Sequence, residues 1–341
     1  MDYENFKTYP NLFSDMATCH AVYDFLENHC GVRWYGPGEW GTVYDARPTL
    51  TVAATPEVRR KPAMVYRELD MGGAHGRDTV RLAGPEDTVS GAEWNRWLRR
   101  LRLGGERFMA AHSTGSLYFY HWAKIRPDHH WSTTAPMKDW FQGRRPELFA
   151  KGYENDRAAW SSMRGWFTPA DNPPPQPCLS EPGTLEFFAQ RARDYFDSKD
   201  VSLRYFQGLW IGGPFYPFHW DDNYWFCKCP ECQAQLDAAA EVMIQDGKGH
   251  GRYSNSHNSR YYFTFVNKLA REVAKTHPDR RIGALAYART ARHPRFDLEP
   301  NIAVQLCTQT RNFWCPATRL NETDIYNEWI AREGGKRPLY L

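Results

Sequence analysis

One stretch of the chain, HWDDNYWFCKCPEC at residues 219–232, contains two adjacent carboxylates followed by three cysteines. Cleavage of a glycosidic bond usually needs one acid that protonates the leaving oxygen and a second group that supplies or stabilises the nucleophile. Asp221 and Asp222 suit the substrate-assisted variant, in which the sugar's own 2-acetamido oxygen attacks. In that hypothesis Asp222 is general acid and base, and Asp221 orients the acetamide. The alternative is an Asp-Asp turn that caps the next segment, because Asp is a common turn residue.

The cysteines of the same stretch, Cys227, Cys229 and Cys232, place three thiols within six residues. This spacing allows all three to face one centre, and structural zinc sites need four such ligands. The fourth ligand would come from elsewhere, with four candidates: His219, Cys178, His250 and His257. A structural zinc ion and metal-free structural cysteines, reduced or disulfide-linked, both remain open interpretations, and neither one adds a catalytic cofactor.

The elements that must position these residues alternate between strands and helices. Strands are predicted near 63–69, 107–113, 176–180, 204–212, 281–288, 301–307 and 337–341. Helices are predicted near 91–103, 182–197, 231–245, 256–276 and 322–333. This alternation favours an α/β fold with a parallel sheet, and seven strands in this length suit a (β/α)8 TIM-like barrel that is incomplete at its C-terminus. No glycine-rich nucleotide-binding motif follows a strand, which argues against a Rossmann or P-loop fold.

A smaller α/β domain is expected at residues 1–60, ahead of the barrel at residues 61–341. The segment ATCHAVYDFLENHCGVRWY has apolar residues at helical spacing, then Gly31 as a stop and a short strand. A second strand is predicted in TLTVAAT, at residues 49–55. The basic run that reaches Pro62 marks the predicted boundary.

Reactive residues of such barrels lie at the carboxyl ends of strands and in the loops that follow. Applied to the predicted strands, this rule gathers polar and aromatic side chains at one face, as a sugar-binding cleft requires. The predicted substrate-binding residues are His75, His112, His121, Trp122, Trp210, His219, Trp220, Tyr287 and Arg289. For each of them a structural hydrogen bond is the competing interpretation.

Composition narrows the class of partner. The chain has 341 residues, a net charge of +3 and 14 Trp, 19 Tyr and 19 Phe, many of them beside Gly, Pro or His. Such rings stack on sugar faces, which favours a carbohydrate partner. The arginines between residues 96 and 102 indicate a solvated helix face rather than a nucleic-acid site. No apolar run is long enough to span a membrane, and the first residues do not form a signal peptide.

Several segments resemble known families. HAVYDFLENHCGVRWYGPGEWGTV is similar to the small domain ahead of the barrel in α-glucuronidase-type glycoside hydrolases. Four further segments resemble the family called domain of unknown function 4838: HHWSTTAPMKDWFQGRRPELFA, QPCLS, DDNYWFCKCPEC and YFTFVNKLAREVAKTHPDRRIGALAYA. In that family's pattern an Asn-Asp pair and glycines precede the cysteines. Here Asp221 replaces the Asn and bulkier residues 223–225 replace the glycines, so the cleft beside the acid should differ in shape.

The resemblance implies a TIM-barrel glycoside hydrolase, similar to the endo-β-N-acetylglucosaminidases of glycoside hydrolase family 163. We therefore expect retaining, substrate-assisted hydrolysis of N-acetylhexosaminide-containing glycans. One alternative is hydrolysis of uronic-acid glycosides, for which Arg289 or Arg311 would bind the carboxylate. Another is a non-catalytic carbohydrate-binding protein or an inactive truncated relative. Export to the periplasm or the cell exterior would follow if the resemblance holds and an N-terminal signal is missing from this chain.

Overall fold

The structure is a computed structural model in which the chain forms two compact units, Met1–Arg107 and Phe108–Leu341. The residues it describes are 12, 15–52, 57–62, 64–67, 79–81, 88–106, 108, 112–115, 117, 145–153, 175–197, 214–221, 225–236, 243–245, 251–253, 258–308, 310 and 313–340. The domain boundary predicted near residue 60 stays a prediction. No helix in these ranges is both long enough and apolar enough to cross a membrane.

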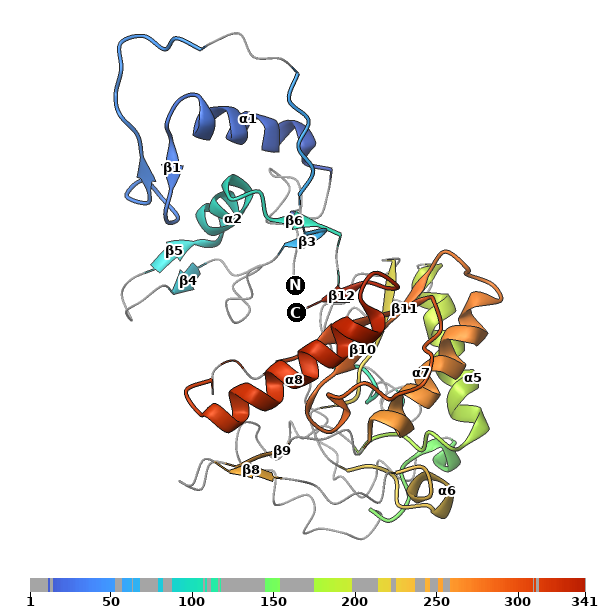
Figure 1. The fold of residues 1–341 in the computed structure, drawn as a ribbon. Coiled ribbons are helices and arrows are strands. Elements are labelled where there is room, and N and C mark those ends of the chain that lie inside the picture. Colours follow the sequence, from blue (N-terminus) through green and yellow to red (C-terminus); the bar gives the residue numbers. More distant parts are fainter. Residues whose placement is uncertain are drawn as a thin grey trace. The chain divides into compact units, whose positions relative to one another are not determined.

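Among its described residues, the first unit contains two helices and three pairs of short antiparallel strands. Figure 1 draws them in blue to teal. Helix α1 (Ala17–Asn28) leads through a turn into β1 (Arg33–Trp34), which pairs with β2 (Thr42–Val43). The other pairs are β3 (Tyr66–Arg67) with β6 (Gly104–Gly105) and β4 (Thr79–Arg81) with β5 (Thr88–Ser90). The predicted helix and first strand of this region are confirmed. Residues 49–52 of the predicted second strand are not extended into a sheet, and residues 53–55 lie outside the described ranges.

Helix α2 (Gly91–Arg100) begins where its sequence supplies a cap. The Ser90 side chain accepts a hydrogen bond from the Glu93 backbone N–H at 3.2 Å, which satisfies one free donor of the first turn. Trp94 and Leu98 lie one turn apart on the buried face. The arginine-rich face is not uniformly solvated, because Arg99 is buried while Arg96 pairs with Glu93.

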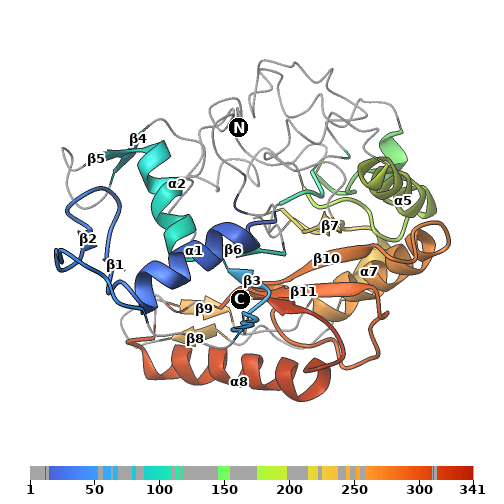
Figure 2. The ribbon, with the colours of Figure 1, turned by 90° about the horizontal axis from the view of Figure 1, so that it is seen from above.

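In its described residues, the second unit is built on a four-stranded parallel sheet in the order β12-β11-β10-β7. Figure 2 shows β11, β10 and β7 side by side. Its strands are β7 (Phe215–Phe218), β10 (Arg281–Ala286), β11 (Ile302–Leu306) and β12 (Leu339–Tyr340). The order of these four strands across the sheet is the reverse of their order along the chain, so each strand pairs with the next one in sequence. In the register of the sheet, Ile282 of β10 pairs with Tyr216 of β7 and with Ile302 of β11. Nearly all residues of β7, β10 and β11 are buried, as in a sheet covered on both faces. An α/β fold with a parallel sheet is therefore confirmed.

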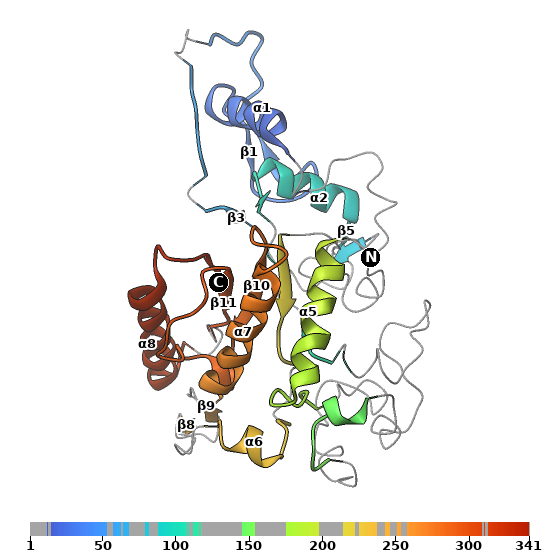
Figure 3. The same cartoon turned by 90° about the vertical axis from the view of Figure 1, so that its right-hand side faces the viewer.

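Three helices pack side by side against this sheet: α5 (Pro182–Phe196), α7 (Ser259–Ala274) and α8 (Pro316–Glu333) (Figure 3). Phe188 of α5 meets Phe265 of α7 with ring centroids 6.3 Å apart, and Phe263 of α7 meets Trp329 of α8 at 5.4 Å. Proline in the first turn of α5 and α8 fits there because that turn needs no intrahelical N–H. The predicted helices near 182–197, 256–276 and 322–333 are confirmed, with α8 starting six residues earlier.

Rings from the two outer described strands meet on the sheet through Phe108. Phe108 stacks on Tyr340 of β12 with ring centroids 4.2 Å apart and packs edge-on against Phe215 of β7 at 5.3 Å. The rings of Tyr340 and Phe215 lie 5.9 Å apart. In a flat sheet three strand spacings separate the backbones of such strands by about 14 Å. Both side chains therefore converge over the middle of the sheet.

Several sequence predictions differ from the structure. The helix predicted over 231–245 is wrong, because α6 covers only Pro230–Gln233 and the backbone of β8 (Met243–Gln245) pairs with β9 (Gly251–Tyr253). Residues 176–180 form a loop rather than a strand. The strands predicted at the end of the chain and at 281–288 and 301–307 are confirmed as β12, β10 and β11. Strand β7 was not predicted, and residues 204–212 lie outside the described ranges.

Candidate functional site

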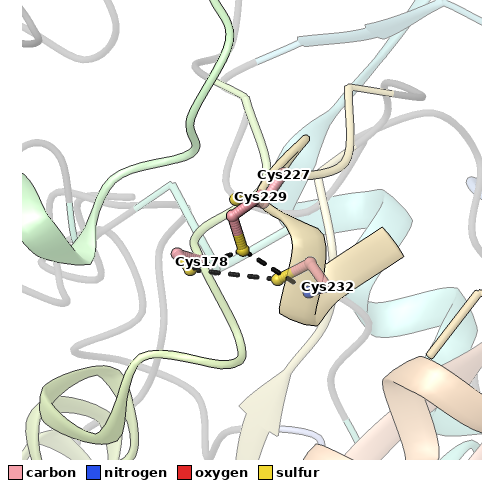
Figure 4. A group of neighbouring side chains, drawn as sticks. All are labelled: Cys178, Cys227, Cys229 and Cys232. Carbon is pink, nitrogen blue, oxygen red and sulfur yellow. Dashed lines mark hydrogen bonds between the residues drawn. The ribbon is translucent and has the colours of Figure 1, made fainter. Parts of the chain in front are cut away.

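Four cysteines converge in the second unit. Cys178 lies in the loop before α5, and Cys227, Cys229 and Cys232 lie in and just before α6. Their sulfurs all lie within 4.8 Å of one another, and Figure 4 shows the side chains directed toward a common centre. Cys178, Cys227 and Cys232 are buried, and Cys229 is half-buried. The sequence therefore identified three members, and Cys178 is the candidate that completes the set.

Short-range geometry places the three clustered cysteines. Cys229 caps α6, and its sulfur accepts a hydrogen bond from the Cys232 backbone N–H at 3.4 Å. Pro230 occupies the first turn, where its fixed φ is compatible with helix and its missing N–H costs nothing. Gln233 donates from Nε2 to the Cys227 carbonyl at 2.8 Å, which closes the turn. This tight turn directs all three sulfurs to one side.

Hydrogen-bond donors surround the sulfurs. The Lys151 backbone N–H donates to Cys227 Sγ at 3.3 Å, and the Tyr261 hydroxyl donates to Cys232 Sγ at 3.2 Å. Ser180 Oγ lies 3.2 Å from Cys232 Sγ and accepts a hydrogen bond from Gln235 Nε2. Donors aimed at sulfur stabilise the thiolate, which is the form that binds metal.

Proton affinity is divided unequally among these sulfurs. The pKa of Cys232 lies far below its ordinary value because Cys178 and Cys227 hydrogen-bond to its sulfur. The pKa of Cys178 lies far above its ordinary value because of the same contacts with Cys227 and Cys232 and because of burial. The pKa of Cys227 is raised to about 12; the hydrogen bond with Cys178 opposes this rise, while that with Cys232 and burial cause it. Without a cation, the first thiolate to form makes its neighbours harder to ionise.

The separations also match a metal centre. Cys178 Sγ lies 3.8 Å from both Cys229 Sγ and Cys232 Sγ. Four sulfurs bonded at about 2.3 Å to one tetrahedral zinc ion are about 3.8 Å apart, whereas a disulfide bond is about 2.05 Å long. All four cysteines are free thiols in the structure. The cluster can therefore hold a metal ion, and its donor set is one that zinc favours.

The carboxylate of Asp221 lies at the carboxyl end of the parallel sheet, three residues after β7, and is buried. Thr114 donates from Oγ1 to Asp221 Oδ2 at 2.9 Å. Gln176 donates from Nε2 to the Asp221 carbonyl at 2.8 Å, and its Oε1 accepts the Asp221 backbone N–H at 3.1 Å. Side chains from two other segments thus fix both the backbone and the carboxylate of Asp221.

Three predicted substrate-binding residues pack together around Trp220, the chain neighbour of Asp221. Trp220 and Tyr287 have ring centroids 5.5 Å apart, and His112 lies 6.4 Å from Tyr287. His112 Nδ1 is 2.6 Å from the Trp220 carbonyl oxygen. Trp220 itself is buried and donates from Nε1 to Thr290 Oγ1 at 2.9 Å. Its ring is therefore packed inside the protein, whereas Tyr287 and His112 are half-buried.

The turn after β10 is strained. Ala288 has a φ of 47°, a left-handed value that a residue with a Cβ adopts at a cost. It lies in η5 (Ala288–Thr290), a short 3-10 turn that also contains Arg289, and Thr290 holds the turn closed by accepting the Tyr287 N–H at 3.4 Å. Such strain often accompanies functional sites, and the strained residue directly follows Tyr287, whose ring lies beside Trp220.

His219 occupies a different environment from the cysteines. It is fully buried, its backbone is bonded to Ser113, and its ring lies 6.2 Å from Phe108. It is not a member of the four-cysteine cluster. The other predicted site residues lie outside the described ranges: Asp222, His75, His121, Trp122, Trp210, His250, His257 and Arg311. Their roles stay predictions.

Thr114 and Gln176, the two residues that hold Asp221, were not predicted from the sequence. Gln176 lies two positions before Cys178 in the QPCLS segment, so that the same short stretch serves both the carboxylate and the cysteine cluster. No local signal marks Thr114. Trp314, between β11 and α8, was also not predicted and is exposed.

A family model named domain of unknown function 4838 matches residues 34–331. The chain belongs to this family. The match includes Asp221, all four clustered cysteines and the strands β7, β10 and β11 of the parallel sheet, whereas β12 lies beyond it. No curated protein and no solved structure matches this DUF4838 chain.

Proposed function

We propose that this DUF4838 protein is a glycoside hydrolase that acts on N-acetylhexosaminide-containing glycans by substrate-assisted, retaining hydrolysis. The observation that carries the proposal is the buried Asp221 at the carboxyl end of a parallel sheet, held by Thr114 and Gln176 beside an aromatic pair. Carboxyl ends of parallel strands are where α/β folds bind their ligands.

A (β/α)8 barrel is part of the proposal. The four strands follow one another in the sheet in chain order, and α5, α7 and α8 pack in one layer. Rings from the two outer strands converge on Phe108, which suits a sheet that curls around a filled interior. A barrel would give the carboxyl ends of these strands one shared rim.

Asp221 in this reaction orients the acetamide of the substrate. Thr114 stabilises one carboxylate oxygen, and Gln176 fixes the backbone on both sides of the Cα atom. A carboxylate placed in this way can accept the acetamide N–H and stabilise the positive charge that develops when the acetamide oxygen attacks. The neighbouring Asp222 is assigned the proton transfers to and from the leaving oxygen.

Hydrolysis of aryl glycosides tests this assignment. Asp222→Asn and Asp221→Asn should each reduce kcat on an aryl N-acetylglucosaminide by at least about 100-fold, the usual range for proton transfer and charge stabilisation. Glu272→Gln, on the exposed surface of α7, is the matched control and should leave the rate unchanged. Undiminished turnover in both Asp variants would refute the assignment.

Two other substrates distinguish the alternatives. Faster cleavage of an aryl glucuronide than of the N-acetylglucosaminide would favour the uronic-acid reaction, in which Arg289 or Arg311 binds the carboxylate. Binding of glycans without release of any product would favour a non-catalytic carbohydrate-binding protein.

We also propose that the four-cysteine centre binds one structural zinc ion through Cys178, Cys227, Cys229 and Cys232. The sulfur separations and the surrounding donors support a four-thiolate site, which leaves zinc no open position for substrate. Zinc would supply charge neutralisation and a cross-link, and it takes no part in the reaction. Purified protein should contain about one equivalent of zinc, Cys178→Ser should lose most of it, and Cys307→Ser should retain it. Zinc-free protein after expression with added zinc would refute this.

A further inference from the structure

Three segments of the second unit are joined around the cysteine cluster. The Gln176 N–H donates to the Trp225 carbonyl at 2.9 Å, and the Cys178 N–H donates to the Leu148 carbonyl at 3.0 Å. The Lys228 N–H donates to the Lys151 carbonyl at 3.0 Å. The cluster therefore lies where the 145–153, 175–180 and 225–233 segments meet, and a bound ion would cross-link the second of these to the third.

Gln176 extends from one of the cross-linked segments to Asp221. Its amide makes two hydrogen bonds to the Asp221 backbone, one as donor at 2.8 Å and one as acceptor at 3.1 Å. Gln176 is 2 % exposed, so bulk water does not compete for the groups that form these two hydrogen bonds. Only one residue, Pro177, separates Gln176 from the ligand Cys178, and its ring restricts the backbone between them.

We propose that occupancy of the four-cysteine centre sets the position of Asp221 and that Gln176 is the positioning residue that connects them. This inference rests on the proposed zinc site and on the proposed role of Asp221. Zinc fixes Cys178, the short link through Pro177 fixes Gln176, and the two amide hydrogen bonds fix the Asp221 backbone. Thr114 then meets the carboxylate in one orientation.

A second route from the centre to Asp221 runs along the chain itself, from Cys227 back through residues 222–226. The structure describes Trp225 and Phe226 on this route, and the Phe226 carbonyl accepts a hydrogen bond from the Tyr153 hydroxyl at 2.8 Å. The two routes make different predictions. Only the route through Gln176 depends on a side chain, and that side chain can be replaced without changing any cysteine of the metal centre.

Amide hydrogen exchange at Asp221 measures the coupling without any substrate. Its N–H is donated to Gln176 Oε1 and lies 3.1 Å from Thr114 Oγ1, so it should exchange slowly in the zinc-loaded protein. Removal of zinc by a chelator should accelerate this exchange at least about tenfold, while amides in the middle of α7, residues 263–270, stay protected as the internal reference.

Gln176→Leu removes both amide hydrogen bonds and keeps a side chain of similar volume. In the zinc-loaded variant, Asp221 should already exchange at the rate of the zinc-free wild type, and zinc removal should then change it less than about twofold, since the link is already broken. Gln176→Glu, which keeps an acceptor but loses the donor, should fall between these limits. Gln190→Leu, on the exposed face of α5, should behave as wild type.

The coupling should also appear in the kinetics. Zinc removal should lower the kcat of the wild type and leave its KM nearly unchanged, whereas zinc removal from Gln176→Leu should lower kcat no further. Unchanged Asp221 exchange after zinc removal would overturn the inference, and so would a full tenfold response in Gln176→Leu, which would assign the coupling to residues 222–226. A protein that binds no zinc would overturn the metal proposal and this inference together. Coupled exchange in a protein that cleaves no glycoside would overturn the proposed reaction alone.

Discussion

Replacement of Glu333 by Gln tests how the end of α8 is attached to the sheet. Glu333 and Arg337 have side chains that are 4 % and 5 % exposed, and Arg337 Nε donates to Glu333 Oε2 at 2.5 Å. Arg337 also donates to the backbone carbonyls of Glu299, Leu298 and Ile302. Removing one partner of a buried ion pair costs about 3–5 kcal/mol, because the other charge stays buried.

We expect the lower end of that range for Glu333→Gln, about 3 kcal/mol, since Arg337 keeps three carbonyl acceptors. For a unit of this size that loss lowers the melting temperature by about 6–12 °C. Urea denaturation followed by tryptophan fluorescence measures the free energy of unfolding. The matched control is Glu272→Gln, which breaks an exposed pair with Lys275 and should cost at most about 0.5 kcal/mol. Equal stabilities of the two variants would refute this reasoning.

The same network predicts that acid destabilises the protein. Burial lowers the pKa of His293, with the hydrogen bond to Glu333 opposing it, and the Arg295 N–H donates to Nδ1 of the neutral ring. Burial would raise the pKa of Glu333, but hydrogen bonds from Arg337 and His293 outweigh it and lower the value. Stability from His293 is complete above its unfolded pKa of 6.5, and that from Glu333 above 4.5. Both contributions are lost as pH falls through the lowered folded values, and Glu333→Gln should abolish the second loss.

Two further substitutions test the site. Thr290→Val removes the acceptor of the buried Trp220 indole N–H and should cost about 1–3 kcal/mol in urea denaturation; a loss below about 0.5 kcal/mol would mean that the indole finds another acceptor. Tyr261→Phe removes a hydroxyl donor from Cys232 Sγ and should weaken zinc binding about tenfold in a chelator competition, whereas unchanged affinity would exclude this donor from the metal's support.

Strands β10 and β11 could be predicted because RIGALAYA and NIAVQLC are short apolar runs bounded by turn residues. Strand β7 could not, because Pro217 argues against a strand. Within the sheet, the Ser113 hydroxyl donates to the Pro217 carbonyl, a contact from a distant segment that no local pattern reveals. Local propensity failed for 231–245 for the same reason, since pairing of β8 with β9 decides that conformation.

The candidate site divides in the same way. Three cysteines in six residues predicted a common centre, because short spacing alone forces their proximity. Cys178 was one candidate among several, since 49 positions separate it from Cys227 and only the folded chain brings them together. Thr114 and Gln176 could not be predicted at all, because their role depends on contacts with Asp221 that only the folded chain makes.

The uneven distribution of the four cysteines along the chain also has a consequence for folding. Cys227, Cys229 and Cys232 can capture an ion as soon as their own turn has formed, whereas recruitment of Cys178 closes a loop of about 50 residues that contains α5 and β7. Closing such a loop costs roughly 3 kcal/mol of chain entropy, and the last metal–sulfur bond would offset it. Zinc supplied during synthesis should therefore hasten the docking of α5, whereas a chain made without zinc should reach the same fold more slowly.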